Sequence, residues 1–542
     1  MIYKLFKKKL HFILLCTLAA ACCLSGCTKH NYKAEADEQV YNIIEQKWTD
    51  DIGAKTNYKI SDTEPLQNNI KIEKQLQNLN YLTLKQTITL ATENSRLYQS
   101  QKELLYLKTL DLTLARYQFE KQIFGGSSRD YTKVDGNYRA DNSAGYGFNQ
   151  LLATGARIST RIALAWVQIL AGDAHGTFGT LFSANITQPL LRASSPEIVQ
   201  ENLTQAERDA LYQIRIFNRF RKTFVVSIVT QYYRVIQNLD AMINAQLNYK
   251  TLTDIYNRAE KLAAAARLPQ FELDQANQDK LKAWDTYLQA QKLYKQSLDE
   301  FKIQLSLSPA AELTLDYNEL ETLKEITKNK PNFSEDEAIA TAIRHRLDIA
   351  NSSDAINDAQ RKVLVAADAL RADLNLVANV EINSKDLKSR GPEQLEDIYS
   401  VGVQLDLPLD RLPERNMYRT AQITLTQKKR EYNQAVDIVT LELRQAYRDF
   451  TEAANRHQTQ LDILQLAQKR FKNTMLLLQY SRANTRDVLD AQGDLFDAQN
   501  IVTQTMVDYT IATLNFYRDT GIMQMQPDGT FQAANITSTN GT

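Results

Sequence analysis

Cysteine and histidine are scarce in this chain. All four cysteines lie at positions 16, 22, 23 and 27, so disulfide bridges and thiolate metal sites are excluded from the rest of the sequence. The five histidines, at positions 11, 30, 175, 345 and 457, do not have the spacing of metal ligands. The nine glycines between residues 125 and 179 form no phosphate-binding pattern. We therefore expect neither an enzyme nor a metal or other non-covalent cofactor.

A surplus of basic charge is also missing. The 64 lysines and arginines are balanced by 64 aspartates and glutamates. Four of the lysines lie in the first 26 residues, so the remainder carries 60 basic and 64 acidic residues, a net charge of −4. Nucleic-acid binding depends on basic side chains that neutralise phosphates. We therefore expect no nucleic-acid partner.

Long apolar runs are absent after residue 27. No stretch of 18 apolar residues occurs there, so the sequence predicts no membrane-spanning helix beyond that point. Within lipid every backbone polar group needs a partner inside the protein, which leaves a closed β-barrel as the other way to cross a membrane.

The first 27 residues have the organisation of a secretion signal. Lysines at positions 4, 7, 8 and 9 precede a short apolar stretch at 12–26. The stretch ends in Leu24-Ser25-Gly26-Cys27, which resembles the lipobox of bacterial lipoproteins. That resemblance implies cleavage before Cys27, with diacylglycerol on its thiol and an acyl chain on its new amino group. The alternatives are an ordinary signal peptide with incidental cysteines and a membrane helix.

The lipobox also predicts a location. Thr28 follows the cysteine, where Asp would retain an enteric lipoprotein at the inner membrane, so the resemblance implies sorting to the outer membrane. We expect residues 1–26 to be the signal peptide and 27–81 to be a lipid-anchored N-terminal linker. The anchored protein would have a large periplasmic part.

Four segments lack both glycine and proline: 66–124, 197–268, 270–308 and 414–492. They predict helices far longer than the average of about 11 residues. In the last segment a mostly apolar stripe has alternating spacings of four and three, typical of coiled-coil-like packing: Leu443, Tyr447, Phe450, Ala454, His457, Leu461, Leu464, Gln468, Phe471, Met475 and Leu478. We expect His457 to be packed in this stripe and not to be a ligand.

Two other segments, at 371–383 and 399–407, alternate between apolar and polar residues. Their apolar sides are Ala372, Leu374, Leu376, Ala378, Val380 and Ile382, and Tyr399, Val401, Val403, Leu405 and Leu407. A noisier pair occupies about 157–169 and 178–188, and the nearby glycines mark loops. This alternation and length are typical of outer-membrane barrel strands. The alternative is a soluble, half-buried hairpin.

The chain repeats itself in tandem. Pro189 and Pro408 close equivalent strands and lie 219 residues apart. Asp274 and Asp487 lie 213 residues apart. The order of helix, two strands, long helix, turn and helix therefore occurs twice, at 82–330 and 331–522, with roughly 30 extra residues in the first repeat. We expect the remaining 523–542 to be a flexible tail.

Four membrane strands per chain cannot close a barrel, since bacterial barrels begin at about eight strands. An open strand edge in lipid would leave backbone groups without partners. The chains must therefore pool their strands. A homotrimer supplies twelve, enough for a barrel with a water-filled lumen.

The strand-closing Gln-Pro-Leu-Leu-Arg at 188–192, the segment Thr-Arg-Asp-Val-Leu-Asp-Ala-Gln at 485–492 and the doubled repeat resemble the TolC family of outer membrane efflux proteins. The resemblance covers about 82–522. It implies a mixed α and β membrane protein, in which a trimeric twelve-stranded barrel continues into a long α-helical periplasmic barrel. It also implies a periplasmic adaptor and an inner-membrane transporter as partners, and passive passage of substrates to the exterior.

The resemblance further implies a narrow periplasmic mouth with acidic residues in its lumen. Asp487 and Asp490 match that motif by position, and Asp274 is the first-repeat counterpart. Rings of carboxylates would favour cations at the constriction. The basic residue that locks the gate in some members aligns with Ala483, beside Arg482.

A capping role is the alternative for one of these acids. Asn484 or Thr485 could cap the final helix, with Asp487 in its first turn, where the helix dipole favours negative charge. At the level of the whole chain, the alternative function is a non-pore coiled-coil envelope lipoprotein with a structural or adaptor role. That function accounts for the helices and leaves the four amphipathic strands unexplained.

Overall fold

The computed structural model describes residues 29–49, 52–55, 57–61, 81–134, 137–169, 177–326, 334–384, 395–407, 409–480, 482–526 and 531–533. The predicted signal peptide, Cys27 and Pro408 lie outside these residues. The chain forms two compact units, one of Met1–Trp48, Leu105–Ile214 and Ser353–Arg430, the other of Thr49–Leu104, Arg215–Ser352 and Glu431–Thr542. Each unit combines segments of both predicted repeats, so a repeat is not a domain. No helix in the described part of the chain is long and apolar enough to span a membrane.

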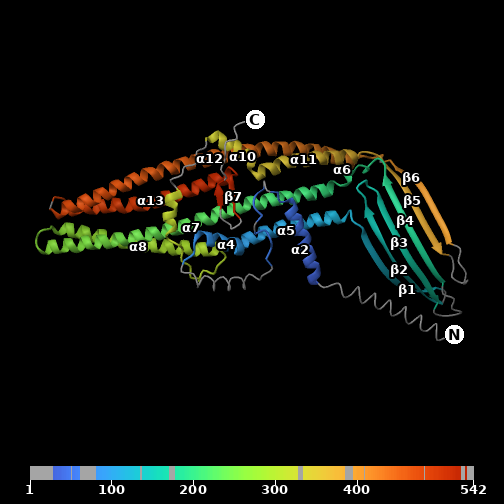
Figure 1. Ribbon diagram of the computed structural model, residues 1–542, viewed down its shortest axis with the longest axis horizontal. Coiled ribbons are helices and arrows are strands. Elements are labelled where there is room, and N and C mark those ends of the chain that lie inside the picture. The colour runs from blue at the N-terminus through green and yellow to red at the C-terminus, as the bar shows by residue number, and fades with distance from the viewer. Residues whose placement is uncertain are drawn as a thin grey trace. The chain divides into compact units, whose positions relative to one another are not determined.

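The helices occur as two matched series (Figure 1). Helices α4 (Leu84–Asn94) and α10 (Glu335–His345) have 11 residues each, and α5 (Arg96–Tyr117) and α11 (Leu347–Asp368) have 22 each. The long helices are α7 (Glu201–Ala264, 64 residues) and α12 (Leu412–Gln479, 68 residues). Helices α8 (Gln270–Gln304) and α13 (Thr485–Asp519) have 35 residues each. The tandem repeat and the long helices are thereby confirmed.

The first helix of each series begins with the same local motif. At α4 the Thr83 N–H donates to Gln86 Oε1 at 3.0 Å, and at α10 the Ser334 N–H donates to Glu337 Oε2 at 3.1 Å. Each capping residue also accepts from the backbone N–H three residues later. This reciprocal arrangement satisfies two N-terminal donors that a helix leaves without partners.

One antiparallel sheet contains β1 (Gln122–Val134), β2 (Asn137–Leu151), β3 (Arg157–Ile169), β4 (Thr177–Pro189), β5 (Asp373–Ser384) and β6 (Leu395–Asp406), in that order (Figure 1). The pairing of β4 with β5 joins the two repeats, with Ile186 opposite Ala378. Strands β3 to β6 confirm the four predicted strands, with bounds that differ by a few residues.

The prediction of four strands per chain missed β1 and β2, whose residues were assigned to loops. Among the glycines that suggested loops, Gly147 lies where the strands approach closely. A Cβ at Gly147 would overlap the Thr160 carbonyl oxygen and lie 2.8 Å from the Phe124 ring. Glycine inside a strand often marks such an approach. The extra residues of the first repeat therefore form an additional hairpin.

Helices α12 and α13 pack through the predicted stripe. Leu443 is fully buried, and Phe450 packs against Phe516 and Tyr509 with ring centroids 5.6 and 5.7 Å apart. His457 is buried in the same row, where burial lowers its pKa. Its Nδ1 lies 3.3 Å from Thr505 Oγ1. His457 is thus a packed side chain, as predicted, whereas Leu461 of the stripe is 39% exposed.

We expect Leu443→Ala to destabilise the protein by about 2–5 kcal/mol, because it removes a fully buried side chain and leaves a cavity. Leu441→Ala is the matched control, since Leu441 lies in the same helix and is 65% exposed. The free energies of denaturant unfolding of the two variants measure the difference. Equal losses for the two variants would contradict the assigned packing.

The predicted linker 27–81 contains folded segments. Helix α2 (Lys29–Lys47) packs through Ile43 against Leu112 and Ala210, and Asp37 accepts a hydrogen bond from Tyr106 Oη at 2.7 Å. Trp48, at the end of this helix, is 1% exposed. This part of the predicted linker is therefore helical and packed, because apolar residues of α2 contact distant helices.

Residues 52–55 and 57–61 of the same segment are also held in place, within the other unit. Lys102 Nζ donates to Asn57 Oδ1 at 2.6 Å, and burial lowers the pKa of Lys102 to about 8. Arg221 donates to the Ala54 carbonyl oxygen at 2.8 Å. Buried basic side chains thus anchor a stretch that the sequence alone marks only as a connection.

The predicted flexible tail begins with ordered structure. Strand β7 (Met523–Met525) pairs with β8 (Phe531–Ala533), and Met523 and Met525 are buried. The tail prediction was wrong for these residues, whose alternation of buried and exposed side chains is too short to stand out in the sequence. The shorter helices α6 (Pro196–Val199) and α9 (Glu319–Ile326) complete the described elements.

Candidate functional site

One face of the sheet is apolar from β3 to β6. The strand register places Ile158 and Ile162 opposite Ile186 and Phe182, and Leu376 opposite Val403. Residues opposite each other in neighbouring strands point to the same face. The apolar residues of this face on β5 and β6 include Leu374, Leu376, Ala378, Val380, Ile382, Tyr399, Val401, Val403 and Leu405. The predicted faces of these strands are thereby confirmed.

This apolar face is exposed in the chain. Val401 is 77% exposed, Val403 65% and Leu405 55%, all on the edge strand β6. Ile186 on β4 is 45% exposed. Large contiguous apolar surface of this kind marks a contact with a membrane or another protein.

The opposite face of the sheet is mostly polar, with Val377 and Ile398 among its apolar residues. Asn379 lies opposite Asn185 on one side and Ser400 on the other. Asn379 Nδ2 donates to Ser400 Oγ at 3.2 Å, and Asn185 donates to Asn379 Oδ1. Arg161 lies on the same face, opposite Ser183. The sheet therefore separates an apolar surface from a hydrogen-bonding one.

The apolar character fades over the first two strands. Tyr146 and Phe148 of β2 continue the apolar face, opposite Ile162 and Thr160. On β1, however, Ser127 and Arg129 occupy that face, opposite Ala144 and Asn142. The four predicted strands thus carry the apolar face, and this face extends onto β2.

Pro189 closes β4 and faces Asn375 at the end of the β5 pairing. Its ring lies 2.8 Å from the position of a Cβ on Gly155, whose φ of +81° few residues other than glycine adopt. Just beyond, the Ala193 N–H donates to Asp368 Oδ2 at 2.7 Å. The first strand-end motif therefore forms a tight, packed turn toward α7, and its counterpart Pro408 lies outside the described residues.

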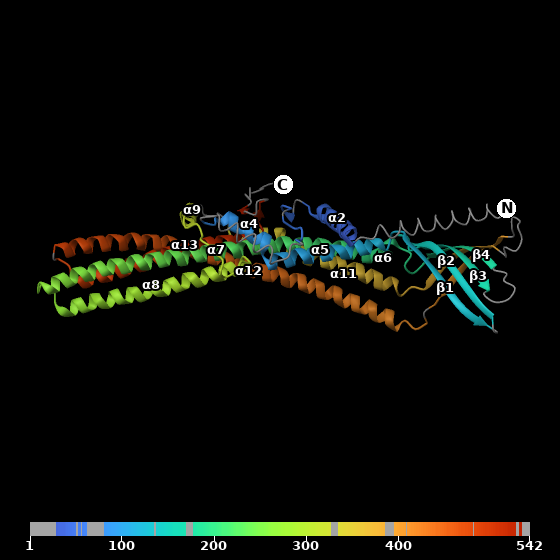
Figure 2. The same ribbon diagram turned by 90° about the horizontal axis from the view of Figure 1, so that it is seen from below.

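The turns between α7 and α8 and between α12 and α13 lie at the same end of their unit (Figures 1 and 2). An apolar cluster joins all four helices there. Its buried members are Leu252, Ile255, Ala259, Ala276, Ala283, Val488 and Leu489, with Met475 and Leu478 of α12 packed against them. The predicted acidic residues of both repeats are therefore carried by one helical bundle end.

Asp487 has a structural partner. Its Oδ2 accepts a hydrogen bond from the Asn484 N–H at 3.0 Å, at the start of α13. Asp490 is 3.9 Å from Arg486, with its side chain 59% exposed. Asp274, the fifth residue of α8, accepts from Gln270 Nε2 at 3.1 Å and is exposed. Asp487 therefore helps to cap the N-terminus of α13. That Asp487, Asp490 and Asp274 line a gate stays a prediction.

Two further acids follow on α13. Asp494 and Asp497 continue the spacing of Asp487 and Asp490 by four and three residues, so the four lie along one side of the helix. Asp494 forms an ion pair with Arg470. Burial, with a smaller contribution from Asp494, raises the pKa of Asp497. The same three-and-four spacing in the sequence could have identified both residues.

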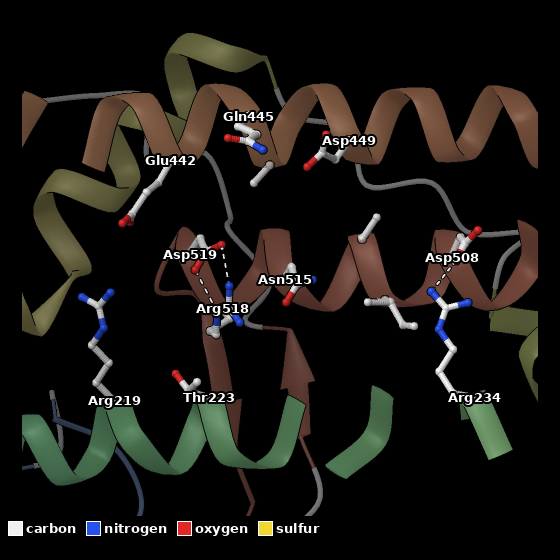
Figure 3. Close-up of a pocket in the computed structure, with 13 residues that line it drawn as sticks. Arg219, Thr223, Arg234, Glu442, Gln445, Asp449, Asp508, Asn515, Arg518 and Asp519 are labelled. Atoms are coloured by element: carbon white, nitrogen blue, oxygen red, sulfur yellow. Dashed lines mark hydrogen bonds and ion pairs between the residues drawn. The ribbon is translucent and has the colours of Figure 1, made fainter. Parts of the chain in front are cut away.

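A polar cavity of about 630 Å³ lies between α7 and the α12–α13 pair (Figure 3). Arg234 pairs with Asp508 at 2.6 Å, and Arg518 pairs with Asp519 at 2.8 Å. Figure 3 shows Asp449 on the α12 side of this cavity. Much of the charge in the cavity is thus neutralised by neighbours. Among the residues that the structure describes, no group of three or more acidic, histidine or cysteine side chains could hold a metal ion.

Solved structures with similar folds include two channels and a further outer membrane protein. The chain matches CusC, whose structures concern folding and transmembrane channel formation, with 14% identity and a TM-score of 0.58 over 86% of this chain and 96% of that one. It matches the outer membrane protein VceC of Vibrio cholerae with 14% identity and a TM-score of 0.56 over 81% and 96%. It matches the open MtrE outer membrane channel of Neisseria gonorrhoeae with 13% identity and a TM-score of 0.58 over 81% and 88%.

No family model and no curated protein sequence matches the chain. The likeness therefore rests on the arrangement of the elements, at sequence identities of 14% or less in these three structures. The paired helix series, the sheet shared by the two repeats and the similar solved structures agree. The chain has the fold of the TolC-like outer-membrane channels, as its sequence predicted.

Proposed function

We propose that this protein is the outer-membrane duct of a tripartite efflux or secretion system. The observation that carries the proposal is the exposed apolar face of β3 to β6, backed by a polar face, in a chain with the fold of outer-membrane channels. A sheet with these two faces separates lipid from water when it closes. The proposed duct conducts substrates passively, from the periplasm or an inner-membrane pump to the exterior.

Three chains are proposed to assemble around one lumen. The edge strand β6 offers backbone groups that need partners within lipid. Strands β3 to β6 of three copies supply the twelve lipid-facing strands that the sequence analysis expects. The β1–β2 hairpin is proposed to lie out of contact with lipid, because Arg129 near the bilayer centre would cost about 2–4 kcal/mol.

The partners proposed are a periplasmic adaptor and an inner-membrane transporter. Similar solved structures include the outer-membrane channels OprN, CmeC and MtrE, and a channel alone supplies no energy for transport. The helical end that carries Asp487, Asp490 and Asp274 is the proposed periplasmic mouth. There the acids are proposed to select cations, with Asp487 also capping α13.

A lipid on Cys27 is proposed to anchor the N-terminus. We expect Cys27→Ser to abolish labelling with radioactive palmitate, because the thiol that carries the lipid is lost. Cys23→Ser is the control, since position 23 precedes the proposed cleavage site and should leave labelling intact. Labelling of Cys27→Ser at the level of the unaltered protein would contradict the lipobox interpretation.

Osmotic swelling separates the duct from the alternative, a coiled-coil lipoprotein without a pore. Liposomes that contain the purified protein should swell in solutions of small sugars, since a water-filled lumen lets the sugars enter. A spacer or adaptor protein leaves the liposomes as impermeable as protein-free ones. Absence of swelling with inserted, folded protein would therefore contradict the proposed function.

A further inference from the structure

Strands β1 and β2 form a hairpin that covers one edge of β3, at the end of the sheet opposite β6 (Figure 1). Strand β2 pairs with β3 along the whole of Arg157–Ile169, and β1 pairs with β2 along its own whole length. A barrel made of β3 to β6 from three copies needs this same edge of β3, because the β6 of a neighbouring copy has to pair there. In the single chain that edge is therefore already occupied.

The hairpin is poorly suited to lipid. On the face that is apolar in β3 to β6, β1 carries Ser127 and Arg129, and both are exposed. On the same face β6 carries Val401, Val403 and Leu405. A basic side chain that faces the bilayer interior is strongly disfavoured. Lipid thus favours the β6 of a neighbouring copy over the hairpin as the partner of β3.

The outer edge of the hairpin does not favour pairing with another chain. Strand β1 carries the charged residues Arg129, Asp130 and Lys133, all of them exposed. Charged side chains on an edge strand, lysine above all, discourage a further strand from joining the sheet. The β6 of a neighbouring copy therefore gains less from adding to β1 than from pairing with β3.

The strands of the hairpin are also rich in glycine. Gly125 and Gly126 lie inside β1, and Gly145 and Gly147 lie inside β2. Strands β3 and β5 contain no glycine. Glycine inside a strand weakens it, because it has no side chain to pack and loses more conformational freedom than other residues. The pairing of β2 with β3 is accordingly suited to being exchanged.

The hairpin is joined to the rest of the chain at one end only. Strand β1 starts at Gln122, which lies opposite Asn149 near the end of β2. Gln150 Nε2 donates to the Phe119 carbonyl oxygen at 3.4 Å, so the segment before β1 and the end of β2 lie side by side. The hairpin can therefore turn away from β3 as a unit about this end, with the order of β3 to β6 unchanged.

We infer that the hairpin covers the edge of β3 in the unassembled chain, and that the β6 of a second copy displaces it when the barrel closes in the membrane. The inference rests on the proposed trimer with strands β3 to β6 in its wall. Before assembly the hairpin protects an edge that would otherwise pair with other chains. Exchange gives β3 a new partner for its backbone groups, and it moves Arg129 away from lipid.

Ser143 of β2 offers two matched disulfide locks, because it lies opposite Ala165 of β3 on one side and Ser128 of β1 on the other. Residues opposite each other in antiparallel strands have Cα atoms about 4.5–5.5 Å apart, which a disulfide can span. Ser143→Cys/Ala165→Cys fastens the hairpin to β3. Ser143→Cys/Ser128→Cys is the control, since it joins only β1 to β2. The Oγ atoms of Ser128 and Ser143 are 2.8 Å apart, and the sequence has no cysteine after Cys27.

The full-length variants are exported into the oxidising periplasm, where a disulfide forms before assembly. Ser143→Cys/Ala165→Cys should lose most of its trimer on mildly denaturing gels of the outer-membrane fraction. Growth with a membrane-permeable reductant should restore the trimer. Ser143→Cys/Ser128→Cys should assemble like the unaltered protein with or without reductant, because the hairpin leaves β3 as a unit.

Oxidation after assembly is the second measurement. In trimers assembled under reductant, an added oxidant should link Ser143→Cys/Ser128→Cys and leave Ser143→Cys/Ala165→Cys unlinked, because β2 no longer lies beside β3. Suppose that the Ser143→Cys/Ala165→Cys protein assembles as well as the control, that it links within the trimer, or that reductant does not reverse its loss. Each result would overturn the exchange and leave the proposed function standing. Absence of a trimer in the unaltered protein would overturn the proposed assembly itself.

Discussion

The Leu376→Lys/Val403→Lys variant is expected to lose nearly all assembled, membrane-inserted protein. The two side chains lie opposite each other on the apolar face of β5 and β6, where they are 38% and 65% exposed. A lysine facing lipid near the bilayer centre costs about 2–4 kcal/mol. Two such changes in every chain are comparable with the whole stability of a typical domain, about 5–15 kcal/mol.

The adjacent register pair provides the control. Asn375 lies opposite Gln404, one position along each strand, and both point to the polar face. Asn375→Lys/Gln404→Lys adds the same charge to the same strands and should leave assembly nearly intact. Heat-modifiable migration on gels and resistance of the outer-membrane fraction to alkaline extraction measure assembly. If both double variants assemble equally well, the sheet does not face lipid as proposed.

The second large effect concerns the helical turns. Asp487→Asn/Asp490→Asn should remove most of the block that trivalent cations impose from the periplasmic side, and should lower cation selectivity. Three copies of the two acids would bring six carboxylates together around a narrow lumen. Carboxylates that lie close together bind trivalent cations strongly, and the amides of asparagine do not. Reversal potentials in salt gradients and block by hexaamminecobalt measure the two changes.

Thermal stability separates the gate from the cap. Asp487 accepts from the Asn484 N–H, so its neutralisation should cost α13 at most about 0.5–2 kcal/mol. Asp336→Asn is the control, because Asp336 is a first-turn acid of α10 and lies away from the turns. A lower melting temperature with unchanged block and selectivity would leave Asp487 as a cap and remove it from the gate.

Much of this fold could be predicted because each element has a strong local pattern. The absence of glycine and proline at 414–492 identified α12, and the alternation at 399–407 identified β6 and its exposed face. The break at residues 480–484 contains neither glycine nor proline, yet Asn484 and Asp487 start a new helix there. The capping residues therefore indicate the boundary between α12 and α13, which no glycine or proline marks.

The rest depended on contacts between distant parts of the chain. Strand β1 contains two glycines and few apolar residues, and it becomes a strand because it pairs along its whole length with β2. Residues 29–47 read as a polar linker, yet Ile43 packs on Leu112 and Ala210. Such partners are far away in sequence, so a local pattern does not reveal them.

The candidate site likewise has features that the sequence predicts and features that only the structure shows. The two faces of β3 to β6 follow directly from alternation, because a period of two fixes which side chains share a face. The acids at the turns could be located by repeat position, and the hydrogen bond of Asp487 to Asn484 required the structure. Whether these acids surround a lumen depends on how copies of the chain assemble, which is a property of the complex.

Single-channel recording in planar lipid bilayers tests the central claim most directly. The purified full-length protein, shown to be folded by its helical circular dichroism, should insert in discrete steps of equal conductance. Cations should be preferred over anions, and the Asn375→Lys/Gln404→Lys variant should conduct as well, with a changed selectivity. Folded protein that associates with the bilayer and never produces conductance steps would contradict a duct and favour a non-pore envelope lipoprotein.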